Sequence, residues 1–217
     1  MDYDIASIIQ TISIWGIPVL LAITLHEAGH GYAAMKCGDR TAYMLGRVTL
    51  NPLKHIDPFG TILLPLVLVV TGAPFIIGFA KPVPVNFRNL HNIRRDSVIV
   101  AFAGPFMNIV LAILSVALMY IAVMLPAGYA VALIEMCKAS IIINVILCVF
   151  NLVPILPLDG GRILAALLPG PLSYRFGQTE RYGFIIILIL VFSGLLWQII
   201  GPVMSVILNI LNQFTPR

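Results

Sequence analysis

Long uncharged apolar runs are the feature that most limits how this chain can fold. Hydrophobic residues make up 60% of the 217 residues and charged residues only 10%, against about 45–50% and about 25% in soluble domains. So few charges could not cover a water-facing surface, and disordered chains, coiled coils, collagens and secreted disulfide scaffolds are excluded on the same grounds. The runs that are long enough for a spanning helix of about 20 residues are 5–35, 61–80, 98–125, 130–152 and 181–213.

These runs predict an all-α polytopic membrane protein, a bundle of about five to six transmembrane helices. The length suits a single integral membrane domain over residues 1–217. The N-terminal sequence is acidic, whereas a signal peptide begins with positive charge, so residues 5–25 are expected to stay as the first span. The run 181–213 is too long for one straight crossing. Gly201-Pro202 is the natural break, where either a steep kink or a short hairpin is possible.

Lysine and arginine are concentrated in three short polar stretches, 36–57, 81–96 and 162–181. Basic short loops beside apolar runs follow the positive-inside rule, so they predict a multi-pass protein of the cell membrane with these loops in the cytoplasm. A nucleic-acid partner is not expected. His55 and His91 lie in these stretches and are expected at solvated or interfacial positions.

The run 61–80 leaves two topologies open. It is flanked by two of the basic stretches, and Pro65 and Gly72-Ala73-Pro74 interrupt it. Broken backbone at membrane depth needs protein or a wet cavity around it. One interpretation is therefore a re-entrant or extended segment around 61–86, or two short half-crossings. The other is an ordinary kinked span with one basic loop outside.

The first apolar run ends in the sequence His26-Glu27-Ala28-Gly29-His30, an H-E-x-x-H pattern. On a helix, residues at i and i+4 share one face, where two imidazoles can bind one tetrahedral zinc ion. The glutamate between them can take a proton from water at the metal. His26 and His30 are therefore candidate zinc ligands, and Glu27 is a candidate general base.

A third ligand is needed, and Asp159 is the best candidate. It follows Pro154 and Pro157 and precedes Gly160-Gly161, so it lies on irregular backbone rather than in a regular span. The alternative is that Asp159 only caps the helix that follows.

Two asparagines also interrupt apolar runs. Asn108 follows Ala103-Gly104-Pro105, and Asn151 ends the run 130–152. Each could donate to a substrate carbonyl or oxyanion, or could bridge two helices. The spacing of Asn108 favours the bridge.

Together these residues resemble the site-2 proteases, which are intramembrane zinc metalloproteases. The resemblance rests on H-E-A-G-H at 26–30, A-G-P-x-x-N at 103–108 and N-x-x-P-x-x-P-x-D-G-G at 151–161, in this order. The stretch 78–86 is also similar to small bacterial and archaeal members without a PDZ domain. The resemblance implies that His26, His30 and Asp159 hold one zinc ion per chain and that Glu27 is the catalytic base. It further implies that Asn108 and Asn151 help to hold substrate.

The expected reaction is hydrolysis of peptide bonds in or next to a transmembrane helix of a single-span membrane protein, as in regulated intramembrane proteolysis. The basic stretches place the active site toward the cytoplasmic side. Such a substrate helix must unwind, and residues 78–86 could pair with it as an added strand. Two alternatives stay open: a metal-binding transporter or channel, and an inactive protease-derived scaffold.

Overall fold

The computed structural model describes residues 5–63, 67, 78 and 81–216, and in these residues the chain is helical without a β-strand. This confirms the all-α prediction. Within the same residues, four helices are long and apolar enough to cross a membrane, one or two fewer than the sequence suggested. They are α1 (Ile5–Lys36), α4 (Ile93–Ala122), α5 (Ala127–Asn151) and α9 (Leu195–Gln213).

The helix α1 carries the first apolar run and continues without a break through the H-E-x-x-H sequence. Its 32 residues make it about 48 Å long at 1.5 Å per residue. That is longer than a hydrocarbon core of about 30 Å. The two histidines are therefore on regular helix, as the spacing argument requires.

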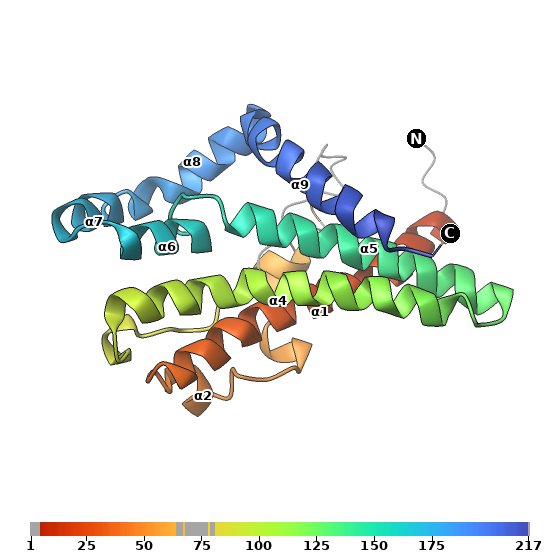
Figure 1. The fold of residues 1–217 in the computed structure, drawn as a ribbon, viewed down its shortest axis with the longest axis horizontal. Helices are drawn as coiled ribbons and strands as arrows, with labels where there is room; N and C mark the ends of the chain where they lie inside the picture. Colours follow the sequence, from red (N-terminus) through yellow and green to blue (C-terminus); the bar gives the residue numbers. More distant parts are fainter. Residues whose placement is uncertain (1–4, 64–66, 68–77, 79–80, 217) are drawn as a thin grey trace.

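The helices α4 and α5 lie side by side as the central pair, with α1 crossing them and α9 on α5 (Figure 1). The side chain of Asn92 caps the first turn of α4 by accepting from the backbone N–H of Arg95 at 3.0 Å. Small residues let the pair approach closely. The buried residues along their seam include Ala112, Ser115, Val116, Met119, Cys137, Ser140 and Ile141.

The crossing of α1 and α4 is close because glycine stands at the contact point. A Cβ atom on Gly29 would lie 2.8 Å from Cγ of Met107 and 2.9 Å from the backbone oxygen of Ala103. The backbone oxygen belongs to a helix and cannot move aside alone. Gly29 thus sets the distance at which the histidine-bearing turn of α1 meets α4.

The C-terminal part begins after α5 with α6 (Asp159–Leu167) and α7 (Gly170–Gly177), and α8 (Glu180–Phe192) then leads to α9. A hairpin at Gly201-Pro202 is wrong, because Pro202 lies inside α9. The chain turns instead at Gly194, whose φ of +74° favours glycine. Val145 and Val149 of α5 pack against Leu196 and Ile200 of α9.

The connection between α1 and α4 holds α2 (Thr41–Met44), the turns η1 (Pro52–Lys54) and η2 (Pro58–Leu63), and η3 (Phe87–Asn89). Asp39, Arg47 and His55 of this connection are all buried. For His55 the expectation of a solvated or interfacial position is wrong: its exposed fraction is 1%, and its Nε2 lies 3.0 Å from the backbone oxygen of Thr49. Most of the run 61–80, for which the sequence allows two topologies, lies outside the described residues.

We predict that Gly29→Ala destabilises the protein by about 1–3 kcal/mol, the usual cost of overpacking a close contact. Gly16→Ala in the same helix is the matched control, because a Cβ there meets nothing within 4 Å. The control should be neutral or slightly stabilising, since alanine favours helix. Thermal unfolding of the two purified variants in the same detergent measures their stabilities. Equal unfolding midpoints would show that Gly29 is not needed for the close contact of α1 with α4.

Candidate metal centre

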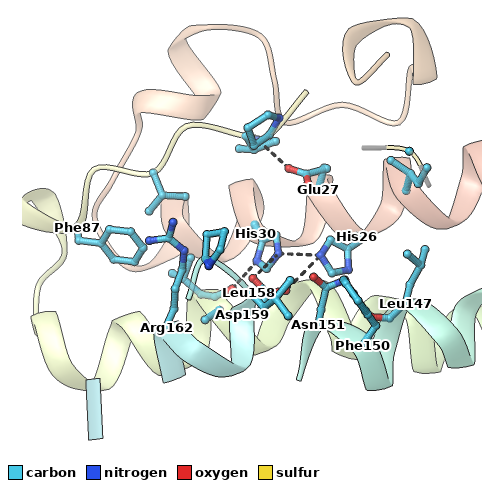
Figure 2. A pocket seen from close by; sticks show the side chains of 18 residues that line it. His26, Glu27, His30, Phe87, Leu147, Phe150, Asn151, Leu158, Asp159 and Arg162 are labelled. Atoms are coloured by element: carbon cyan, nitrogen blue, oxygen red, sulfur yellow. Dashed lines mark hydrogen bonds and ion pairs between the residues drawn. The ribbon is translucent and has the colours of Figure 1, made fainter. Parts of the chain in front are cut away.

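The two histidines of the H-E-x-x-H sequence stand one turn apart on α1 and face a common point (Figure 2). Their Nε2 atoms are 3.1 Å apart, and their rings meet edge to face with centroids 4.7 Å apart. This is the arrangement that the i, i+4 spacing predicts.

Asp159 reaches the same point from the first turn of α6. Its Oδ2 lies 3.3 Å from Nε2 of His26, and its Oδ1 lies 3.4 Å from Nε2 of His30. Gly160 and Gly161 let α6 turn back against the end of α5, because a Cβ on either would collide with the backbone of Leu152 or Ile155. Asp159 thus faces the histidines across 133 residues of sequence, from residue 26 to residue 159.

The hydrogen bonds of the two Nδ1 atoms determine which ring nitrogens of His26 and His30 can bind a metal ion. Nδ1 of His26 lies 2.7 Å from Oδ1 of Asn108, and Nδ1 of His30 lies 2.7 Å from the backbone oxygen of Val100. Both oxygens can only accept, so each Nδ1 carries the hydrogen. The Nε2 atoms are therefore the ones that a metal could take.

These donors fit a metal ion. One ligand atom from each of His26, His30 and Asp159 lies within 4.8 Å of the others. Among the described residues, Oδ2 of Asp159 is buried and has no hydrogen-bond partner, and such a carboxylate oxygen is costly unless a cation satisfies it. Two imidazole nitrogens and one carboxylate, with a further position open, are the donor set of catalytic zinc sites.

Gly104 of α4 forms the floor of this cluster. A Cβ on Gly104 would collide with Nε2 of His30 and would lie 2.7 Å from Nε2 of His26. Any larger residue would therefore occupy the space that the histidines leave between them. Gly104 thus lets the two histidines of α1 lie close to the backbone of α4.

Glu27 lines the same space but points away from the histidines, toward the segment 81–86 (Figure 2). We call residues 81–86 the strap. The backbone N–H of Val83 in the strap donates to Oε2 of Glu27 at 2.7 Å. The carboxylate of the candidate base is thus held by main chain rather than by a side chain.

The strap is itself fixed at both ends by buried polar groups. At its start, Nη2 of Arg47 donates to the backbone oxygen of Lys81 at 2.8 Å, and the Lys81 N–H donates to the backbone oxygen of His55 at 2.9 Å. At its end, the Asn86 N–H donates to Oδ2 of Asp39 at 2.7 Å. Burial alone would raise the pKa of Asp39, but donors from Thr41, Asn89 and Asn86 bring that pKa below its usual value.

A cavity of about 710 Å³ lies between the histidine cluster and the strap. This volume is typical of ligand sites. His26, Glu27, His30, Asp159 and Asn151 line it. Apolar and aromatic side chains complete the wall, and Arg162 lies over the ring of Phe87 at 5.6 Å. The cavity has room for several residues of an extended peptide between the strap and α5.

The two asparagines differ in their surroundings. Asn151 lines the cavity and donates to the backbone oxygen of Leu147 at 2.9 Å. Asn108 is fully buried behind His26, and its amide links α4 to Ala22 of α1 and to Asn144 of α5. The contacts of Asn108 are those of a helix bridge. Direct binding of substrate by Asn108 or Asn151 stays a prediction.

Sequence reasoning missed Val83, Val100 and Asn144. The first two act through backbone atoms, which no residue type marks. Asn144 is an amide inside the apolar run 130–152, and such a residue in a membrane helix is itself a signal.

Comparisons with known proteins agree on one family. A family model described as peptidase family M50 matches residues 15–138 and 121–193. The "Putative zinc metalloprotease YwhC" of Bacillus subtilis (strain 168) is 38% identical over 193 residues, which cover 87% of this chain and 84% of the relative. The "Putative zinc metalloprotease Rip2" of Mycolicibacterium smegmatis is 33% identical over 175 residues, which cover 80% of this chain and 64% of the relative. No solved structure matches the chain.

The matched residues span most of the chain and include both the histidine-bearing helix and α6. The apolar helices, the cluster of two imidazoles and a carboxylate, and these relatives lead to the same conclusion. The chain belongs to peptidase family M50, the site-2 protease family, and is a zinc metalloprotease of the membrane.

Proposed function

We propose that this protein hydrolyses peptide bonds in or next to transmembrane helices of membrane protein substrates. In this proposal His26, His30 and Asp159 hold one zinc ion, and Glu27 is the general base. The observation that carries it is the meeting of three metal-ligand atoms from α1 and α6 beside Glu27, in one cavity within a bundle of apolar helices. A substrate in the bilayer reaches such a site without leaving the lipid.

The chemistry divides between the metal and the chain. Bound zinc supplies Lewis-acid polarisation of the scissile carbonyl and lowers the pKa of water to about 7. Glu27 takes the proton from the attacking water at its carboxylate and delivers it to the leaving amine. The N–H of Val83 holds Oε2 of Glu27 in place.

The strap supports the binding of an unwound substrate. Pro82 and Pro84 have no N–H, and the N–H groups of Lys81, Val83 and Asn86 donate to His55, Glu27 and Asp39. Among the contacts described for the strap, the N–H of Val85 has no acceptor, and Val85 lines the cavity. Val85 is therefore the donor that remains for a substrate carbonyl, as in strand addition.

The orientation in the membrane follows from charge. The stretches 36–57, 81–96 and 162–181 carry the excess of lysine and arginine, and we propose that they face the cytoplasm. The cavity, the strap and its anchors then open on the cytoplasmic side, where water reaches Glu27.

The direct test uses purified protein in vesicles with a synthetic single-span substrate that carries either Gly-Pro or Leu-Leu at its centre. A helix hides its carbonyls in its own hydrogen bonds, so the Gly-Pro substrate should be cut faster. Fragments that appear at the same rate in the presence of a zinc chelator would overturn the proposed function.

Glu27→Gln should lower the cleavage rate by about 10²–10⁴-fold, the usual contribution of a general base, and should leave the zinc content unchanged. Glu135→Gln is the matched control, since Glu135 is half-exposed and pairs with Lys138 at 2.8 Å on α5. Cleavage by the Glu27→Gln protein at the rate of this control would remove Glu27 from the reaction.

Gly104→Ala should lose most of its zinc, because the added methyl group occupies the space between the two Nε2 atoms. Elemental analysis of the purified protein measures the zinc content. The control is Gly128→Ala in α5, where a Cβ meets nothing within 4 Å. Full zinc occupancy in the Gly104→Ala protein would show that the metal lies elsewhere.

Val85→Pro should raise KM or lower kcat/KM by about 3–10-fold, the value of one lost hydrogen bond. Val85→Ala keeps the N–H and should change KM and kcat/KM little. Cleavage of the Gly-Pro substrate by both proteins measures this difference. If the two variants cleave alike, the substrate does not pair with the strap at Val85.

A further inference from the structure

We infer that Asn144 of α5 is a positioning residue for the metal centre: it orients the amide of Asn108, which keeps the hydrogen of His26 on Nδ1 and leaves Nε2 for the metal. Asn144 is fully buried and is absent from the residues that line the cavity. The inference rests on the proposed function, because it assigns His26 as a ligand.

The orientation of each of the two side-chain amides, Asn144 and Asn108, is set by a neighbouring oxygen atom that can only accept a hydrogen bond. Nδ2 of Asn144 donates to the backbone oxygen of Ser140 at 2.8 Å, so Oδ1 of Asn144 must face the other way. That oxygen accepts from Nδ2 of Asn108 at 2.8 Å. The direction of the Asn144 amide is thus fixed by main chain of its own helix.

The same reasoning carries the direction on to His26. Nδ2 of Asn108 also donates to the backbone oxygen of Ala22 at 3.2 Å, so both its hydrogens are used and its Oδ1 faces His26. The contact between that Oδ1 and Nδ1 of His26 is 2.7 Å. Of the two acceptors that hold Asn108, Asn144 makes the shorter contact.

His30 does not need such a chain of side chains. Its Nδ1 faces the backbone oxygen of Val100 directly, and that oxygen is part of α4. His26 instead contacts the side-chain amide of Asn108, which can rotate. The two ends of this amide differ in that Oδ1 accepts and Nδ2 donates. An amide that turned over would offer an N–H to Nδ1 and would favour a hydrogen on Nε2, which blocks metal binding at that atom.

The test compares Asn144→Leu with Ser115→Ala in the purified full-length protein. Leucine removes the acceptor for Asn108. It is larger than asparagine, but a small cavity beside Asn144 of about 70 Å³ gives it room. Ser115 belongs to the same seam and bonds to the hydroxyl of Ser140 at 2.7 Å. That hydroxyl lies 3.3 Å from Nδ2 of Asn144, but the shorter contact with the backbone oxygen of Ser140 at 2.8 Å already sets the direction of the Asn144 amide. Competition for zinc against a chromogenic chelator measures the affinity of each protein.

Zinc affinity should fall about tenfold in Asn144→Leu, the lower end of the effect of groups that orient metal ligands, and stay within twofold in Ser115→Ala. Equal affinity in the wild type and Asn144→Leu would overturn the inference while leaving the proposed function intact. A wild-type protein that binds no zinc would instead overturn the proposed function.

A second measurement separates positioning from general loosening. In the zinc-loaded protein labelled with ¹⁵N-histidine, the Nδ1–H of His26 should exchange with solvent at least several-fold faster in Asn144→Leu than in the wild type. The Nδ1–H of His30, held by Val100, is the internal control and should not change. Equal acceleration at both histidines, or a wild-type His26 without a hydrogen on Nδ1, would contradict the role of Asn144.

Discussion

The fold depends on bringing a carboxylate and two imidazoles together inside a bundle of apolar helices. Polar and ionisable groups are expensive in such surroundings, and here the buried Oδ2 of Asp159 has no hydrogen-bond partner among the described residues. A divalent cation bound there would convert this cost into a favourable interaction and would join α1 to α6, two elements that lie far apart in the sequence. Metal binding at this cluster would therefore be coupled to the packing of the bundle.

The main features of both fold and site could be predicted because they depend on local pattern. Apolar runs gave the four long helices, and the spacing of His26 and His30 gave their common face. Asp159 stood out because prolines and glycines surround a carboxylate at the end of an apolar run. Membrane helices make such reasoning effective, since each charged or amide side chain within them needs a cause.

The rest could not be predicted because it depends on contacts between distant segments or on main-chain atoms. His55 looked like a loop residue, and only the folded connection shows that its side chain is buried and its backbone oxygen holds the strap. The turn at Gly194 was missed because a proline is the stronger sequence signal, yet α9 tolerates Pro202 inside the helix. Helix interiors lose one hydrogen bond at such a proline, and neighbouring helices can compensate.

The contact between Val83 and Glu27 has a consequence for how this enzyme can vary. The donor is a peptide N–H, which nineteen of the twenty amino acids carry and proline alone lacks. Related chains can therefore carry a different side chain at this position, within the space that its buried surroundings allow, while the glutamate keeps its partner. A search by residue identity would pass over the position, although its N–H holds the carboxylate of the proposed base.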